Sequence, residues 1–125
     1  MHGKLQVVVR IYGIRNCDSM QKAFVWLAEH AVVCDFVDYR QAAPSAAQLA
    51  DWNLRVGWKA LLNTRGTTWR RLGEEDRADV DEARALTLMA RHPSLIRRPV
   101  IDTGTALLVG FDPDRYAREL LGRGP

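Results

Sequence analysis

Apolar residues along this chain fall into short β-branched runs and into longer stripes with the spacing of a helix. A run at residues 5–12, which ends at Gly13, predicts a buried central strand, and a second run at residues 32–39 predicts another strand. Between the two runs, a stripe at i, i+3, i+4, i+7 and i+8 predicts a helix packed on a core: Met20, Ala23, Phe24, Leu27 and Ala28. A helical crossover of this length favours a parallel strand pair.

The middle of the chain has helical patterns. Ser45, followed three residues later by Gln48, has the spacing of a capping box and predicts a helix that runs to about Val56 and stops at Gly57. Residues 58–63 predict one further helical turn.

A basic stretch at residues 64–73 has the composition of a loop. After it, Asp79 and Glu82 have a second capping-box spacing, which predicts a helix that is closed by His92 and Pro93.

The last quarter of the chain predicts two strands and a helix. Residues 98–111 read as a hairpin around a Thr103-Gly104 turn, and Asp112-Pro113 predicts the start of a helix that ends before Gly122. The order is β-α-β, a helical block, then β-β-α. This order predicts an α/β chain with a thioredoxin-like fold, in which a small mixed sheet is flanked by helices. We expect residues 1–125 to form a single domain with a helical insertion at about residues 45–92.

Composition narrows the class of protein. A chain of 125 residues suits one hydrophobic core, and its 47% hydrophobic and 26% charged residues are typical of a protein that folds in water. The apolar run near the N-terminus meets Arg10 and Gly13 and lacks a small-residue cleavage pattern, so it predicts a strand rather than a signal peptide. We therefore expect a cytoplasmic protein that does not interact with a membrane, and we expect a monomer.

Net charge and cysteine count exclude several kinds of site. The net charge is +3, but the 18 basic residues are scattered among 15 acidic ones, which makes direct nucleic-acid readout the least favoured function. Two cysteines make no disulfide framework, and no Cys/His spacing predicts a metal site. We expect reduced thiols and no bound cofactor.

Cys17 lies at the predicted start of the first helix, where a thiol can be activated. Only the thiolate is nucleophilic, and a helix N-terminus lowers a cysteine pKa through unpaired N–H groups and the helix dipole. Asp18 acts in the opposite direction, whereas Arg15 favours the thiolate. The alternative for Cys17 is a small buried apolar residue. For Cys34, which lies within a strand-like run, a place in the core or the sheet is favoured.

A monothiol mechanism requires a second thiol from solution, because position 20 holds Met20 and not a cysteine. Glutathione is the obvious co-substrate, and its carboxylates call for cationic or N–H contacts. Most of the available cations are expected to be solvated surface charges: Lys59, Arg65, Arg70, Arg71, Arg97 and Arg98. From sequence alone, trans is the expected isomer of the Arg98-Pro99 bond.

Three stretches together resemble the arsenate reductase-like (ArsC/Spx) family, and specifically its YffB-type branch. They are Y-G-I-R-N-C-D-S-M-Q-K-A, L-L-N-T-R-G-T-T-W-R-R-L and H-P-S-L-I-R-R-P-V-I, followed by V-G-F. The similarity runs from Ile11 to about Tyr116, with the motifs in family order. The resemblance implies a thioredoxin-like domain with a helical insertion.

The resemblance also implies roles for individual residues. Cys17 matches the family's nucleophilic cysteine, and Arg98 matches the arginine that precedes a cis-proline, here Pro99. Lys59 stands where arsenate-reducing relatives carry an oxyanion-binding arginine, and Asn16 belongs to the N-C dipeptide of the branch. Cys17 and Arg98 are thus the expected catalytic residues, and Asn16, Lys59, Arg98 and Pro99 are expected to bind substrate or glutathione.

Three functions follow from this resemblance. The first is a glutathione-dependent thiol reductase that uses Cys17 as its nucleophile and acts on a small thiol or anionic substrate. The second is an Spx-like regulator that binds the transcription machinery, although the local C-x-x-C of many Spx proteins is replaced by Cys17-Asp18-Ser19-Met20. The third is arsenate reduction, which is disfavoured because L-L-V-G-F lacks the arginine that those enzymes carry after the final hairpin.

Overall fold

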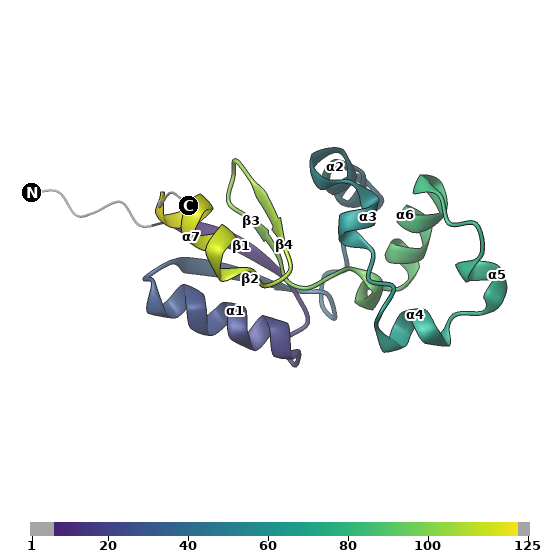
Figure 1. The fold of residues 1–125 in the computed structure, drawn as a ribbon, viewed down its shortest axis with the longest axis horizontal. Helices are drawn as coiled ribbons and strands as arrows, with labels where there is room; N and C mark the ends of the chain where they lie inside the picture. The colour runs from purple at the N-terminus through teal and green to yellow at the C-terminus, as the bar shows by residue number, and fades with distance from the viewer. Residues whose placement is uncertain (1–6, 123–125) are drawn as a thin grey trace, which may run out of the picture. The chain divides into compact units, whose positions relative to one another are not determined.

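The computed structural model describes residues 7–122, which divide into two compact units. The sheet unit comprises residues 7–38 and 98–122, and the helical unit comprises residues 39–97. Figure 1 shows both units. The predicted Leu5 and Gln6 of the first strand lie outside the described residues.

The sheet unit contains a four-stranded mixed sheet in the order β2-β1-β3-β4. Strand β1 pairs in parallel with β2 and antiparallel with β3, and β4 completes the hairpin. The parallel pair, the hairpin and the predicted α/β fold class are therefore confirmed. The elements of this unit are β1 (Val8–Gly13), α1 (Asp18–Glu29), β2 (Val33–Asp38), β3 (Val100–Asp102), β4 (Leu107–Val109) and α7 (Pro113–Leu121).

Helices α1 and α7 cover the same face of the sheet. Val9 and Ile11 of β1 point to this face, because side chains alternate along a strand. The aromatic rings of Trp26 and Tyr116, one from each helix, meet edge to face with their centroids 5.4 Å apart. This packing holds α1 and α7 together on the sheet, and Cys17 lies at the start of α1.

The helical unit is built on the packing of α2 against α6. Its elements are α2 (Ala46–Val56), α3 (Trp58–Leu61), α4 (Thr67–Arg71), α5 (Glu74–Arg77), α6 (Glu82–Arg91) and the short 3₁₀ helix η1 (Pro93–Leu95). An antiparallel bridge joins Leu62 to Ile96. Beside it, the Arg97 N–H donates to the Leu61 carbonyl at 2.7 Å, so the end of the unit is tied to the residues at the end of α3.

Two local predictions in the helical unit need correction. The predicted cap Asp79 is not the residue that begins α6; Asp81 is, and its carboxylate accepts the Arg84 N–H at 2.9 Å. The stretch at residues 64–73 is not all loop, because α4 lies within it. By contrast, Ser45 caps α2 as predicted and accepts the Gln48 N–H at 3.0 Å.

Candidate functional site

Cys17 is the N-cap residue of α1, with an extended backbone at φ −142° and ψ 136°. Its carbonyl accepts the Gln21 N–H at 3.0 Å and so begins the helical hydrogen-bond ladder. Its side chain is half-buried. The sulfur therefore lies among the first N–H groups of the helix, as the sequence pattern predicts.

The pKa of Cys17 is lowered from its ordinary value by a balance of opposed effects. Burial is the largest single influence and raises the pKa, because it disfavours the thiolate. Hydrogen bonds from the Met20 amide and from the Arg98 side chain, the positive charge of Arg98 and a hydrogen bond from the Ser19 amide lower it, and together they outweigh burial. The site thus favours a thiolate inside a partly desolvated environment.

Arg98 is brought to the thiol by the start of β3. The peptide bond between Arg98 and Pro99 is cis, as the family resemblance implies and contrary to the trans isomer expected from sequence alone. The Pro99 carbonyl accepts the Gly110 N–H at 2.8 Å, and the Gly110 carbonyl accepts the Tyr116 hydroxyl at 2.7 Å. Arg98 therefore stands on a backbone that the core of the sheet unit holds in place.

Met20 occupies the position at which a dithiol enzyme would carry its second cysteine. Its side chain is fully buried against Gly13, so closely that a Cβ on Gly13 would collide with the Met20 sulfur. The Met20 side chain thus packs α1 on β1, while its backbone amide serves Cys17. The sequence identified Met20 as a core residue, and its amide is one of the unpaired N–H groups that the predicted helix start supplies.

The second cysteine has the opposite environment. Burial, and then the charge of neighbouring Asp35, raise the pKa of Cys34. Cys34 lies on β2 and packs against the core cluster of the sheet unit. The pKa values of the two thiols are therefore shifted in opposite directions, and that of Cys17 is the lowered one.

The loop between β1 and α1 is held by side chains on both sides of it. The guanidinium of Arg15 lies 5.0 Å from the centre of the Phe36 ring, and the Gln21 amide donates to the Arg15 carbonyl at 2.8 Å. Asn16, directly before Cys17, is exposed. Its role in binding a ligand stays a prediction.

Lys59 belongs to the helical unit, on α3, and is exposed. Its ammonium lies 5.6 Å from the centre of the Trp58 ring. The guanidinium of Arg97 donates to the Ala60 carbonyl of the same helix at 3.2 Å. The grouping of Lys59 with Cys17 stays a prediction.

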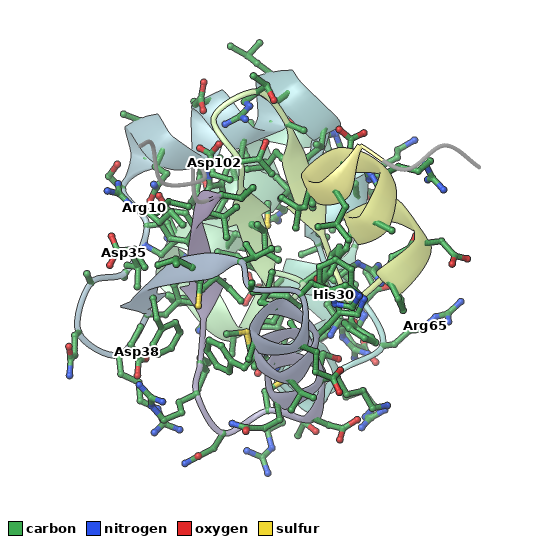
Figure 2. The ribbon with its side chains drawn as sticks, turned by 90° about the vertical axis from the view of Figure 1, so that its left-hand side faces the viewer. Arg10, His30, Asp35, Asp38, Arg65 and Asp102 are labelled. Atoms are coloured by element: carbon green, nitrogen blue, oxygen red, sulfur yellow. The ribbon has the colours of Figure 1, made fainter. Side chains whose placement is uncertain are left out.

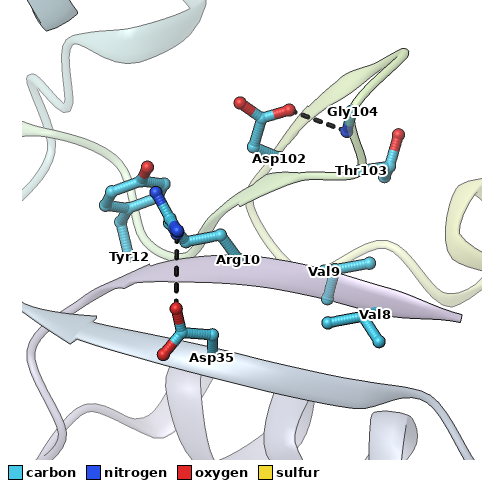
Figure 3. Close-up of a pocket in the computed structure, with 8 residues that line it drawn as sticks. All are labelled: Val8, Val9, Arg10, Tyr12, Asp35, Asp102, Thr103 and Gly104. Atoms are coloured by element: carbon cyan, nitrogen blue, oxygen red, sulfur yellow. Dashed lines mark hydrogen bonds and ion pairs between the residues drawn. The ribbon is translucent and has the colours of Figure 1, made fainter.

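A separate charged hollow, of about 290 Å³, lies on the sheet unit (Figures 2 and 3). Arg10 lies 3.4 Å from the Asp35 carboxylate, while the Asp102 carboxylate accepts the Gly104 N–H at 2.9 Å. A hydrogen bond with Tyr12 is the first cause that raises the pKa of Arg10. Alternation along β1 puts Arg10 on the face opposite Val9, away from α1 and α7. The sequence pattern gave no prediction of this hollow.

No group of His, Cys, Asp and Glu side chains within residues 7–122 is arranged to hold a metal ion. In the same range, no helix is long and apolar enough to cross a membrane.

The arrangement of thiol, helix start and cis-proline can now be compared with known proteins. Residues 12–118 match the ArsC family. The chain belongs to the ArsC family. The structure of a protein named YffB (PA3664) is 47% identical, with a TM-score of 0.86 over 90% of this chain and 98% of that one. An arsenate reductase (ArsC) related protein from Brucella melitensis is 41% identical, with a TM-score of 0.74 over 95% and 98% of the two chains.

Other ArsC-family relatives differ in their stated roles. An uncharacterised protein of Haemophilus influenzae is 38% identical over 109 residues, which cover 87% of this chain and 96% of that protein. The global transcriptional regulator Spx of Streptococcus mutans is 28% identical over 116 residues, which cover 86% and 79%. An arsenate reductase from Vibrio cholerae, at 20% identity and a TM-score of 0.75, shows the shared thioredoxin-like fold alone.

Proposed function

We propose that this ArsC-family protein is a glutathione-dependent thiol reductase in which Cys17 is the nucleophile. The observation that carries the proposal is the lowered pKa of Cys17, because the Met20 amide, Arg98 and the Ser19 amide together outweigh the effect of burial. A stabilised thiolate at a helix start has no packing purpose, whereas it is what thiol exchange requires.

The reaction is proposed to run in two exchanges. In the first, the Cys17 thiolate attacks one sulfur of a disulfide, the S–S bond breaks, and the other sulfur leaves as a thiolate that takes a proton from water. In the second, a glutathione thiolate attacks the sulfur now bonded to Cys17, and Cys17 leaves as a thiolate. One substrate sulfur is thus released as a thiol, and the other ends in a mixed disulfide with glutathione, whose sulfur is oxidised, so the enzyme returns to its starting state.

Other residues have supporting roles in this proposal. Arg98 stabilises the Cys17 thiolate before attack and again when it leaves. Asn16 donates a hydrogen bond to the ligand, and the backbone at Pro99 receives glutathione as an added strand. Lys59 is proposed to bind one of the carboxylates of glutathione.

The test is turnover of a small disulfide with glutathione, coupled to NADPH and glutathione reductase. We expect Cys17→Ser to abolish turnover with an unchanged fold by circular dichroism, while Cys34→Ser keeps it. Equal activity of the Cys17→Ser variant and the wild type would refute the proposal.

A second candidate role rests on the similarity to the Spx regulator of Streptococcus mutans. In this role the protein would bind the transcription machinery, and Cys17 would regulate that binding or be dispensable. A pull-down with purified RNA polymerase tests it, and absence of enrichment over a control bait would count against it. Arsenate reduction is tested in the same coupled assay by adding arsenate in place of the disulfide.

A further inference from the structure

An apolar groove runs along the exposed side of α1 within the sheet unit. It has a volume of about 360 Å³ and is lined by Gln21, Lys22, Val25, Trp26, Glu29 and Phe111. Val25 is 56% exposed, on a helix that buries its other face. Lys22 is drawn to one rim by its ion pair with Asp18 at 3.1 Å. The floor is therefore apolar and the charges stand at the edges.

The walls of the groove are held rigidly. The Phe111 ring meets the Tyr116 ring edge to face, with centroids 5.7 Å apart, and Trp26 stacks on His30 at 3.9 Å. His30, labelled in Figure 2, is the C-cap residue of α1, at the opposite end of the helix from Cys17. Since these rings are fixed by the core, the groove exists before any ligand binds.

Both walls of the groove begin at the thiol site. One wall is α1, whose N-cap is Cys17. At the end of the groove nearest the thiol, the Gln21 amide donates to the Arg15 carbonyl, in the loop before Cys17. On the other side, Phe111 directly follows Gly110, whose N–H donates to the Pro99 carbonyl. A chain that places a sulfur at Cys17 can therefore lay its next residues along this groove.

Glutathione does not suit the groove, because it carries two carboxylates and no apolar side chain. An apolar side chain on a peptide does, because its burial would cover Val25 and Phe111. Resting on the proposed function, we infer that the substrate is a peptide or protein whose cysteine is disulfide-bonded to glutathione, and that the groove binds an apolar side chain near that cysteine.

The geometry also sets the spacing between the cysteine and the apolar residue. Val25 lies eight positions after Cys17, or about 12 Å along a helix that rises 1.5 Å per residue. An extended peptide covers about 3.3 to 3.6 Å per residue. The preferred apolar residue is therefore three or four positions from the substrate cysteine.

In the reaction, the Cys17 thiolate attacks the glutathione sulfur of the mixed disulfide. The S–S bond to the peptide breaks, the peptide leaves as a thiolate that is protonated by water, and Cys17 is left bonded to glutathione. A second glutathione then releases Cys17 and departs as glutathione disulfide. The sum is reduction of the peptide disulfide by one added glutathione, which is oxidised.

The test uses a set of glutathionylated peptides in which one leucine is moved through the five positions on either side of the cysteine of a polar sequence. For the wild type we expect kcat/KM to be about tenfold higher with leucine at the third or fourth position than with serine there. A flat profile, with turnover intact, would overturn the groove assignment.

The variant Val25→Asp places a charge in the groove, and we expect it to remove the leucine preference. The ratio between the two peptides does not depend on the fraction of folded enzyme, so a folding loss does not imitate the result. Leu54→Asp is the matched control, because Leu54 is 85% exposed on α2 and outside the groove. A preference that survives Val25→Asp, or that is lost equally in Leu54→Asp, would contradict the inference.

Direct binding separates this inference from the proposed function. The Cys17→Ser protein is titrated with the reduced leucine and serine peptides by calorimetry. Tighter binding of the leucine peptide without turnover in the wild type would sustain the groove and refute the reductase. Turnover in the wild type, with equal binding of the two peptides, would sustain the reductase and refute the groove.

Sedimentation tests another occupant of the groove. If Val25→Asp changed a dimer into a monomer, the groove would belong to a second copy of the chain, and the inference would be wrong.

Discussion

At Cys17, burial and hydrogen bonding oppose each other, and Arg98 contributes to the outcome in two ways. Its side chain hydrogen-bonds the sulfur and its charge favours the thiolate. Removal of the guanidinium leaves the burial effect and the two amide contacts. The thiolate should then be less stable, although the helix start still favours it.

We therefore expect Arg98→Gln to raise the pKa of Cys17, so that its alkylation becomes half-maximal at a higher pH than in the wild type. The measurement is the rate of iodoacetamide reaction against pH on a Cys34→Ser background. Arg97→Gln is the control, because the Arg97 guanidinium is engaged by the Ala60 carbonyl. Identical profiles for wild type and Arg98→Gln would show that Arg98 does not act on the thiol.

Sequence reasoning located Cys17 because its position depends on local pattern alone, a strand followed by a helical stripe. The contact with Arg98 depends on the pairing of β1 with β3, which joins residues far apart in the chain. Family resemblance supplied it, as it supplied the cis isomer at Pro99. The contribution of the Met20 amide follows from the predicted helix start, because the N–H groups of the first turn have no partner within the helix.

At the scale of elements, the junction of β1 and α1 depends on a missing side chain. Gly13 lies directly against Met20, and any Cβ there meets the Met20 sulfur. Because Met20 is fully buried, it cannot move aside without disturbing the core.

We expect Gly13→Ala to lower the free energy of unfolding by about 1–3 kcal/mol, as overpacked cores do. Urea unfolding followed by circular dichroism measures it. Gly73→Ala is the control, because nothing lies within 4 Å of the position a Cβ would take there. A Gly13→Ala protein as stable as the Gly73→Ala protein would show that the junction is not tightly packed.

The sequence pattern predicted the elements with long apolar stripes well, but it missed the short helices that lack such a stripe. Helix α2 has a capping serine, buried Leu49 and Trp52, and a terminal glycine, all of which are visible in the sequence. Helices α4 and α5 bury no residue and span 5 and 4 residues, too short to form by propensity alone. Their structure comes from tertiary contacts such as that between Thr68 and Ser94, whose hydroxyls lie 2.9 Å apart.

On the scale of the whole molecule, Tyr116 links the core of the sheet unit to the backbone of the site. It is fully buried, and its hydroxyl donates to the Gly110 carbonyl at 2.7 Å. Burial, and then the charge of Asp112, raise the pKa of Tyr116 far above its ordinary value. Above a pH of about 10, the unfolded chain therefore releases the phenol proton of Tyr116, whereas the folded chain keeps it.

This difference predicts a loss of stability in alkaline solution. The contribution of Tyr116 to the free energy of unfolding is complete below its unfolded pKa of about 10. It falls as the pH rises above that value, because only the unfolded chain releases the proton. We expect the urea midpoint to fall above pH of about 10, and to fall less steeply in Tyr116→Phe. Parallel slopes for the two proteins would exclude Tyr116 as the source.

The division into two units marks the limit of what the sequence predicts about the whole molecule. The helical block was visible as a region between the two halves of the sheet, yet the position of Lys59 relative to Cys17 depends on how that block is placed. The single-domain arrangement, the monomeric state and the shared site of these two residues stay predictions.

The most direct measurement for the central claim is the intact mass of the Cys34→Ser protein after reaction with a glutathione mixed disulfide and then with glutathione. The proposal predicts one glutathione bonded to Cys17 after the first reaction, and its complete removal after the second. A Cys17 thiol that forms no adduct, or an adduct that glutathione does not release, would contradict the account of Cys17 as a nucleophile resolved by glutathione.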